Sequence, residues 1–281
     1  MKLYSLLLAF LFSLLTSVAN SQNTLQALHV MTYNLRYDNP ADGQDAWKER
    51  RAEVGSFLMG KGLYASCEAP DILGVQEALN SQLQFLDIVM QGYSRYSRGR
   101  DDGQTAGEHA AIYWRTDRFS LLDSGTFWLS EQPNFPNKGW DAALPRIASW
   151  VKLKENKKIF LVLNTHFDHM GVKARAESAR QLAAWVRQQA QPVIVMGDFN
   201  CEVHEQPLKI LREGGLTETR PSLDTTPTFN GFTWPKARHK LIDFILTRGF
   251  ITHSYHVIQP KRSNGRQLSD HYPVEARLFW P

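Results

Sequence analysis

The sequence predicts one α/β domain whose strands and helices are arranged in layers, and three observations support this class. Short apolar runs typical of buried strands recur along the chain, and segments with apolar residues at helical spacing lie between some of them. Strands and helices do not alternate strictly, which argues against a regular barrel. No change in composition and no linker divides the chain after its first residues.

The composition is that of an ordinary globular protein. Of the 281 residues, 43% are hydrophobic and 21% are charged. A formal net charge of +4 fits an anionic substrate but is too small by itself to indicate nucleic-acid binding. Two cysteines, Cys67 and Cys201, exclude a disulfide-stapled miniprotein and a cysteine-based zinc finger. An oxidising compartment would permit a bond between them, and the sequence leaves that pairing open.

The N-terminal residues have the layout of a secretory signal peptide. Lys2 supplies a positive charge, residues 3–15 are almost entirely apolar, and small residues around Ala19 form a small-x-small cleavage pattern. The run is too short for an ordinary transmembrane span. We therefore predict a signal peptide over residues 1–21, a folded domain over residues 22–281 and a secreted or periplasmic location. An uncleaved N-terminal anchor is the alternative.

The first half of the domain predicts two strands and two helices, followed by further strands. Residues 27–35 (ALHVMTYNL) are β-prone, and residues 47–59 have apolar side chains at helical spacing. The short apolar run at residues 71–75 (DILGV) predicts a buried strand, and residues 80–90 predict a second helix. Three β-like segments follow at residues 109–115, 119–129 and 146–153.

The second half predicts another buried strand at residues 159–164 (IFLVLN), after a turn marked by two lysines. Residues 172–190 have apolar residues at helical spacing, and residues 192–196 (PVIVM) predict the next strand. The remaining predicted elements are a short helix at about residues 205–213, a loop rich in Thr, Pro and Gly at 217–240, and strands at 241–246 and 274–278.

Polar residues stand where most of these predicted strands begin or end. Ligand sites in layered α/β folds gather at strand ends, where the scaffold is rigid and side chains converge. A single Asn or Asp there is equally well explained as a turn former, but together these residues supply the parts of one chemistry. They are Asn34, Glu77, His166 with Asp168, Asp198 with Asn200, Asp243, and Asp270 with His271.

That chemistry is the metal-assisted hydrolysis of a phosphate ester. Glu77, Asn34 and one of the later aspartates offer the hard oxygen ligands that suit Mg²⁺ or Mn²⁺. A histidine can transfer a proton or donate a hydrogen bond to a phosphate oxygen, and an aspartate beside it selects the tautomer. The chain contains no HExxH, CxxC, GxSxG or GxxxxGKS motif, which argues against zincins, redox proteins, serine hydrolases and P-loop enzymes.

Six motifs in their order along the chain resemble the endonuclease/exonuclease/phosphatase superfamily, which includes deoxyribonuclease I. The motifs are MTYNLRYDN, GVQEA, NTHFDH, GDFN, IDFIL and SDHYPV. The resemblance runs from about residue 28 to residue 279. It implies a four-layer αββα sandwich of two packed mixed β-sheets flanked by helices, and a metal-dependent phosphoric ester hydrolase that uses Mg²⁺ or Mn²⁺.

The resemblance also implies roles for the residues at matching positions. Glu77 would be the main metal ligand, with Asn34 helping to hold the metal or its water. Asp270 could be a further metal ligand. Asp198 would orient or activate the attacking water, and Asn200 would bind the scissile phosphate.

The histidine motifs imply the remaining roles. His271 would contact the phosphate and stabilise the transition state, with Asp243 as its partner. His166 resembles the second active-site histidine of deoxyribonuclease I, which pairs with a glutamate, and Glu108 lies at the matching place. Arg146 resembles a phosphate-contacting arginine of the same subgroup.

Some residues depart from the family pattern or match no motif. Arg36 stands where the abasic-site endonucleases carry an aspartate, which weakens a DNA-repair assignment. Arg95, Arg98 and Arg100 lie beside two aspartates, and we expect them in a solvated loop. His169 matches no motif, and we expect it to be structural or exposed.

We therefore predict a secreted, divalent-metal-dependent phosphohydrolase, most simply a phosphodiesterase that uses in-line attack of water. Its partner would be a phosphoester, either a nucleic acid, a phospholipid head group or a small molecule, and the protein would be a monomer with no obligate protein partner. The alternatives are a phosphomonoesterase, a sphingomyelinase-like lipid phosphodiesterase and a secreted binding module without turnover. The complete acid–base and metal set favours an enzyme, because a pure binding protein does not need it.

Overall fold

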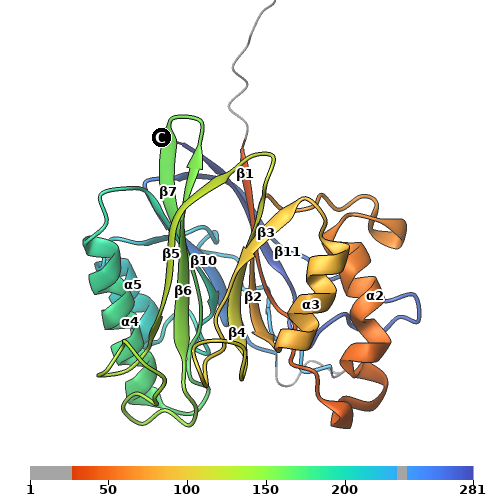
Figure 1. Cartoon of the computed structure of the whole chain (residues 1–281), viewed down its shortest axis with the longest axis horizontal. Coiled ribbons are helices and arrows are strands. Elements are labelled where there is room, and N and C mark those ends of the chain that lie inside the picture. The colour runs from red at the N-terminus through yellow and green to blue at the C-terminus, as the bar shows by residue number, and fades with distance from the viewer. Residues whose placement is uncertain (1–26, 233–238, 281) are drawn as a thin grey trace, which may run out of the picture.

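A computed structural model describes residues 27–232 and 239–280, so the predicted signal peptide lies outside the described residues. The described chain forms two six-stranded sheets packed face to face (Figure 1). In the first sheet the strand order is β11 (Ile251–Val257), β12 (Val274–Phe279), β1 (Leu28–Asn34), β2 (Ile72–Ala78), β4 (His109–Arg115) and β3 (Tyr93–Tyr96). In the second sheet it is β5 (Ser120–Trp128), β6 (Ile147–Glu155), β7 (Lys158–His166), β8 (Val193–Asp198), β10 (Asp243–Arg248) and β9 (Thr217–Glu218).

Helices cover the outer face of each sheet, as Figure 1 shows. Helices α2 (Trp47–Leu58) and α3 (Asn80–Val89) lie on the first sheet, and α4 (Val172–Arg187) and α5 (Gln206–Glu213) lie on the second. Two short 3₁₀ helices, η1 (Pro40–Asp45) and η2 (Gly62–Tyr64), flank α2. The layers are therefore α, β, β and α, and the predicted fold class is confirmed.

Among the described residues, three large apolar clusters hold these layers together, and a small fourth cluster consists of Ala110, Trp128 and Ile147. In β1, Leu28 and Val30 face the other sheet, whereas Met31 and Tyr33 pack against the helices α2 and α3. A third core joins α4 and α5 to the second sheet. Strands buried on both faces need apolar side chains at nearly every position, and this explains the continuous apolar runs in the sequence.

The two sheets approach each other closely where β2 faces β7 and β8. A Cβ atom on Gly74 would lie 2.8 Å from Cε of Met196 and 3.0 Å from Cγ of Asn164, so a larger residue would not fit without a shift. Asn164 donates hydrogen bonds to the carbonyls of Val75 (2.9 Å) and Ala111 (2.8 Å) in the opposite sheet. A buried polar link therefore fixes one sheet against the other.

The strands that the sequence did not predict lie at or near sheet edges. β3 and β11 are the outer strands of the first sheet, and most of their side chains are half-buried or exposed. Without a buried face they carry no apolar run for a pattern to detect. The predicted loop at residues 217–240 begins with the two-residue strand β9, and its residues 233–238 lie outside the described part.

Cys67 and Cys201 are both free. Cys67 packs in the core beneath α2, whereas Cys201 packs in the core beneath α4 and α5, so the two thiols lie on opposite sides of the sandwich. Among the described helices, none is both long and apolar enough to cross a membrane.

Candidate active site

The second sheet places three predicted residues in a row. β7 and β8 are parallel, with His166 opposite Asp198, and β8 and β10 are antiparallel, with Asp198 opposite Asp243. Each of these residues lies at an end of its strand. Sheet register, and not proximity in sequence, therefore brings a histidine and two carboxylates to one edge.

The first sheet supplies Asn34, at the end of β1, and Glu77, where the pairing of β2 with β4 becomes irregular between Val75 and Ala78. Glu77 has a φ of 63° and Asn200 a φ of 46°. This left-handed conformation costs a non-glycine residue about 1–2 kcal/mol. Strained backbone of this kind clusters at functional sites, and here it occurs at two predicted site residues.

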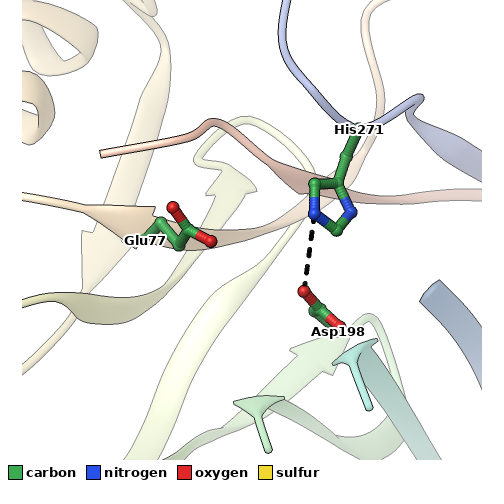
Figure 2. Close-up of side chains that lie close together, drawn as sticks. All are labelled: Glu77, Asp198 and His271. Atoms are coloured by element: carbon green, nitrogen blue, oxygen red, sulfur yellow. Dashed lines mark ion pairs between the residues drawn. The ribbon is translucent and has the colours of Figure 1, made fainter. Parts of the chain in front are cut away.

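Glu77, Asp198 and His271 each offer a ligand atom, and these atoms lie within 4.8 Å of one another. Figure 2 shows the three side chains converging from separate segments of the chain. The Nδ2 of Asn34 donates to Oε1 of Glu77 and to Oδ2 of Asp198, both at 3.0 Å. Two carboxylates held this close repel each other unless a cation lies between them, so the donor set fits a hard divalent cation.

Asn34 and Asp270, the other predicted ligands, lie beside this group. The side-chain oxygen of Asn34 accepts a hydrogen bond from the backbone N–H of Arg36 (2.9 Å), so its amide nitrogen faces the carboxylates. In this arrangement Asn34 holds Glu77 and Asp198 in place. Asp270 is buried, with its Oδ2 3.8 Å from Nε of Arg36. Burial raises the pKa of Asp270 to about 6.

His271 lies between two carboxylates. Its Nδ1 is 2.8 Å from Oδ2 of Asp243, and its Nε2 is 3.7 Å from Oδ2 of Asp198. Burial alone would lower the pKa of His271, but the charge and hydrogen bond of Asp243, together with the charges of Asp198 and Asp270, outweigh burial and raise it to about 10. A protonated imidazole has no free lone pair for a metal. His271 is therefore better suited to contact a phosphate oxygen than to ligate the cation.

His166 is in the opposite protonation state. Burial, with the positive charge of Arg146 added, places the pKa of His166 well below its ordinary value. Its Nε2 lies 3.5 Å from Oδ2 of Asp198, and its Nδ1 lies 3.7 Å from Oε2 of Glu108. The pKa values of the two histidines are thus shifted in opposite directions, so the two rings can do different work at the same pH.

Asp198 is the common neighbour of both histidines. Burial raises the pKa of Asp198 to about 7, and the charge of Asp243 adds to this effect. Its Oδ1 accepts a hydrogen bond from the backbone N–H of Asn200 (2.9 Å), while the side chain of Asn200 donates to the carbonyl of Phe167 (2.9 Å). Asp198 is therefore held from several sides.

Glu108 lies behind His166 and between two arginines. Nη1 of Arg100 is 2.6 Å from Oε2 of Glu108, and Nη1 of Arg146 is 3.8 Å from the same oxygen. Burial raises the pKa of Glu108 to about 7. The expectation that Arg100 lies in a solvated loop is wrong, because only 8% of it is exposed. The indole Nε1 of Trp128 donates a hydrogen bond to the backbone carbonyl of Arg100 (2.8 Å), and this bond holds the segment around Arg100 against the site.

Arg146 is buried at the opening of β6, and two residues that follow His166 hold it. Its Nε lies 3.4 Å from Oδ2 of Asp168, and its Nη2 lies 3.1 Å from Nδ1 of His169. His169 was given no role from its sequence. Its place three residues after His166, in NTHFDH, was a usable signal.

All predicted site residues except Asn34, Asp168 and Asp243 line one cleft of about 800 Å³. Asn34, Asp168 and Asp243 hold the lining residues by the contacts described above. The cleft is also lined by residues that sequence reasoning did not assign to the site, because they come from loops or match no motif. Among these are Arg36, Arg100, His169, Arg175, Phe229 and Lys240.

Comparisons with known proteins agree with this geometry. The sequence profile of the endonuclease/exonuclease/phosphatase family matches residues 31–271. The structure of a protein of that family from Bacteroides vulgatus is 33% identical, with a TM-score of 0.83, and the alignment covers 91% of this chain and 100% of that chain. The mannosyl-6-phosphatase of Bacteroides thetaiotaomicron is 36% identical, with a TM-score of 0.78 and coverage of 90% and 100%.

A more distant structure shares the fold alone. TDP2 of D. rerio, complexed with a single-strand DNA product, is 16% identical, with a TM-score of 0.71 and coverage of 90% and 98%. No curated protein matches the chain.

The fold and the site together define a phosphoric ester hydrolase. The chain belongs to the endonuclease/exonuclease/phosphatase family, whose enzymes use divalent metals. The family, the fold and the enzyme class predicted from the sequence are confirmed.

Proposed function

We propose that this protein is a Mg²⁺- or Mn²⁺-dependent phosphomonoesterase that removes the phosphate from a small, hydroxyl-rich compound, and that it acts after export. One observation carries the reaction class. The pair of carboxylates joined by Asn34 faces the charged His271 across one cleft. The signal-peptide pattern in residues 1–21 supports export.

The residues of the cleft divide the work of hydrolysis among them. Glu77, held by Asn34, would be the main ligand of the divalent cation. When bound, the cation would neutralise charge that develops on the phosphoryl oxygens. His271, protonated beside Asp243, donates a hydrogen bond to a phosphoryl oxygen, and this bond strengthens as charge builds up there.

The attacking water needs a group that takes its proton. Asp198 is placed to accept it, because the carboxylate lies at the centre of the site and both of its oxygens are oriented by asparagines. His166, which is neutral and 3.5 Å from Asp198, orients the same water. Glu108, which is held by Arg100 and Arg146, lies 3.7 Å from Nδ1 of His166 and faces this side of its ring.

Two considerations favour a phosphomonoester over the phosphodiester that the sequence most simply predicts. A monoester carries more negative charge than a diester, and two cations that line the cleft, Arg175 and Lys240, form no ion pair with the described residues, whereas the other arginines of the cleft are paired with carboxylates. The mannosyl-6-phosphatase is also 36% identical over nearly its whole length, whereas the DNA-bound structure is too distant to support a substrate. We therefore propose a sugar phosphate as the substrate class.

A substrate panel tests the proposal. Mannose 6-phosphate, glucose 6-phosphate, phenyl phosphate and bis-p-nitrophenyl phosphate are assayed with Mg²⁺, with Mn²⁺ and with excess chelator. Asp198→Asn is the inactive variant, and Asp123→Asn, at an exposed position of β5, is its matched control. We expect metal-dependent release of phosphate from the sugar phosphates. Preferential cleavage of the diester would replace the proposal with a phosphodiesterase, and no turnover at all would favour the binding module.

A further inference from the structure

His169 is held rigidly at the edge of the cleft. The carboxylate of the preceding residue, Asp168, accepts hydrogen bonds from the backbone N–H groups of Met170 (3.0 Å) and Gly171 (2.7 Å). These bonds close a turn around His169 just before α4 begins. Asp168 is buried and His169 is exposed, so a fixed backbone presents the imidazole to the cleft that it lines.

The contact with Arg146 determines which ring nitrogen of a neutral His169 carries the proton. Nη2 of Arg146 lies 3.1 Å from Nδ1 of His169. A guanidinium group has only donors, so Nδ1 must accept this bond and carry no hydrogen. The hydrogen of the neutral ring is then on Nε2. His169 therefore offers an N–H donor at Nε2, while its other nitrogen is occupied by Arg146.

Three side chains separate this donor from the metal-ligand group along the contacts of the cleft. These contacts run from Asp198 to His166 (3.5 Å), to Glu108 (3.7 Å), to Arg146 (3.8 Å) and then to His169 (3.1 Å). We place the phosphate at Asp198 and His271, at the other end of this series of contacts. What reaches that part of the cleft is the part of the substrate that departs.

We propose that Nε2–H of His169 donates a hydrogen bond to a hydroxyl oxygen of the leaving group, and that His169 is a specificity-determining residue for hydroxylated phosphomonoesters. This inference rests on the proposed function, which supplies the phosphomonoester. The competing explanation is that His169 only braces Arg146. The two explanations make different demands on the side chain, because the first requires the donor at Nε2 and the second requires the acceptor at Nδ1.

Two substitutions separate these demands. His169→Gln places an N–H donor near the position of Nε2 but removes the acceptor at the position of Nδ1, whereas His169→Asn retains that acceptor and removes the distant donor. The control is His253→Gln, an exposed position on the edge strand β11. For each protein, kcat and KM are measured with mannose 6-phosphate and with phenyl phosphate, whose leaving group has no further hydroxyl, together with the inhibition constant of inorganic phosphate.

We expect His169→Asn to raise KM for the sugar phosphate roughly 5- to 10-fold, the effect of losing one hydrogen bond. We expect the KM of His169→Gln for the sugar phosphate to stay within about twofold of the wild-type value, because glutamine restores the hydrogen-bond donor. Phenyl phosphate hydrolysis and phosphate inhibition should not change. An unchanged KM in His169→Asn would overturn the inference. Equal losses of kcat/KM on both substrates in His169→Gln would also overturn it, because they would indicate that His169 only holds Arg146 in place.

The remaining outcomes are also decisive. Weaker inhibition by phosphate in His169→Asn would mean that the donor meets the phosphoryl group and not the leaving group, which overturns the assignment. If the wild-type protein hydrolyses no phosphomonoester, the proposed function fails and this inference fails with it. A failure confined to the variants leaves the proposed function standing, so the two failures can be told apart.

Discussion

The substitution Asp243→Asn tests whether His271 acts as a cation. The carboxylate of Asp243 lies 2.8 Å from Nδ1 of His271, and it is the main group that raises the pKa of His271 from an ordinary 6.5 to about 10. This difference corresponds to about 5 kcal/mol in favour of the imidazolium. Asparagine keeps the shape and an acceptor oxygen but removes the charge. Burial then acts with less opposition, and the pKa of His271 falls.

The expected sign of the pH dependence follows from this change. Wild-type His271 keeps its proton until the pH rises through about 10, so activity that needs the imidazolium persists through neutral and mildly alkaline pH. In Asp243→Asn the proton is lost at lower pH, so the alkaline limb of the pH–rate profile should move down. At pH 7.5 we expect kcat to fall about 10²- to 10⁴-fold, the range for losing a preorganised charge contact or a correctly oriented histidine.

The assay is kcat between pH 5 and 10, at saturating Mg²⁺, with the best substrate of the panel. Asp123→Asn is the control for the charge change alone, and a thermal melt shows whether Asp243→Asn folds. A folded Asp243→Asn variant with the wild-type profile would refute the assignment of His271 as a cation. A variant that loses activity only at temperatures where it melts would show that the pair is structural.

Three further predictions concern the metal, the arginine pair and the sheet interface. Glu77→Gln should weaken Mn²⁺ binding at least about tenfold, measured by calorimetric titration, and activity that persists in excess chelator would contradict a metal site. Arg100→Gln should lower kcat about 10- to 100-fold at temperatures where the variant is folded and should also lower Tm, because the buried Glu108 loses its partner at 2.6 Å; wild-type kinetics would exclude a role for Arg100. Gly74→Ala should destabilise the domain by about 1–3 kcal/mol in urea unfolding, because its Cβ would lie 2.8 Å from Met196, and an unchanged midpoint would show that the sheets can separate there.

The sequence predicts the interior of this protein better than its edges. Strands buried on both faces, such as β7 and β8, can be recognised in the sequence as apolar runs because both of their faces contact a core. The edge strand β11 has exposed or half-buried side chains at nearly every position, so its sequence carries no periodic signal. Its strand conformation depends on pairing with β12, a tertiary contact that local patterns do not encode.

The same limit applies to the site. Strand-end residues such as Asp198 were predictable because they follow recognisable runs, and residues such as Glu108 were predictable through the family resemblance. Arg100 was misjudged because its neighbours in sequence are aspartates, while its partner in space, Glu108, follows a loop that folds back. His169 ends the NTHFDH motif, but its contact with Arg146, 23 residues earlier in the chain, is a tertiary contact that the sequence pattern does not show.

The opposite protonation states of the two histidines follow from what the two sheets place around each ring. His271 meets Asp243 at 2.8 Å, and a second carboxylate, Asp198, lies 3.7 Å away, so the cation is favoured despite burial. His166 shares Asp198 as a neighbour, but burial lowers the pKa of His166, and the charges of Arg146 and Arg100 add to this effect. Removing positive charge near His166 should therefore raise its pKa toward the ordinary value, whereas removing negative charge near His271 should lower that of His271. NMR titration of the two rings in Arg146→Gln and Asp243→Asn would show shifts in opposite directions, and shifts in the same direction would contradict this division of charge.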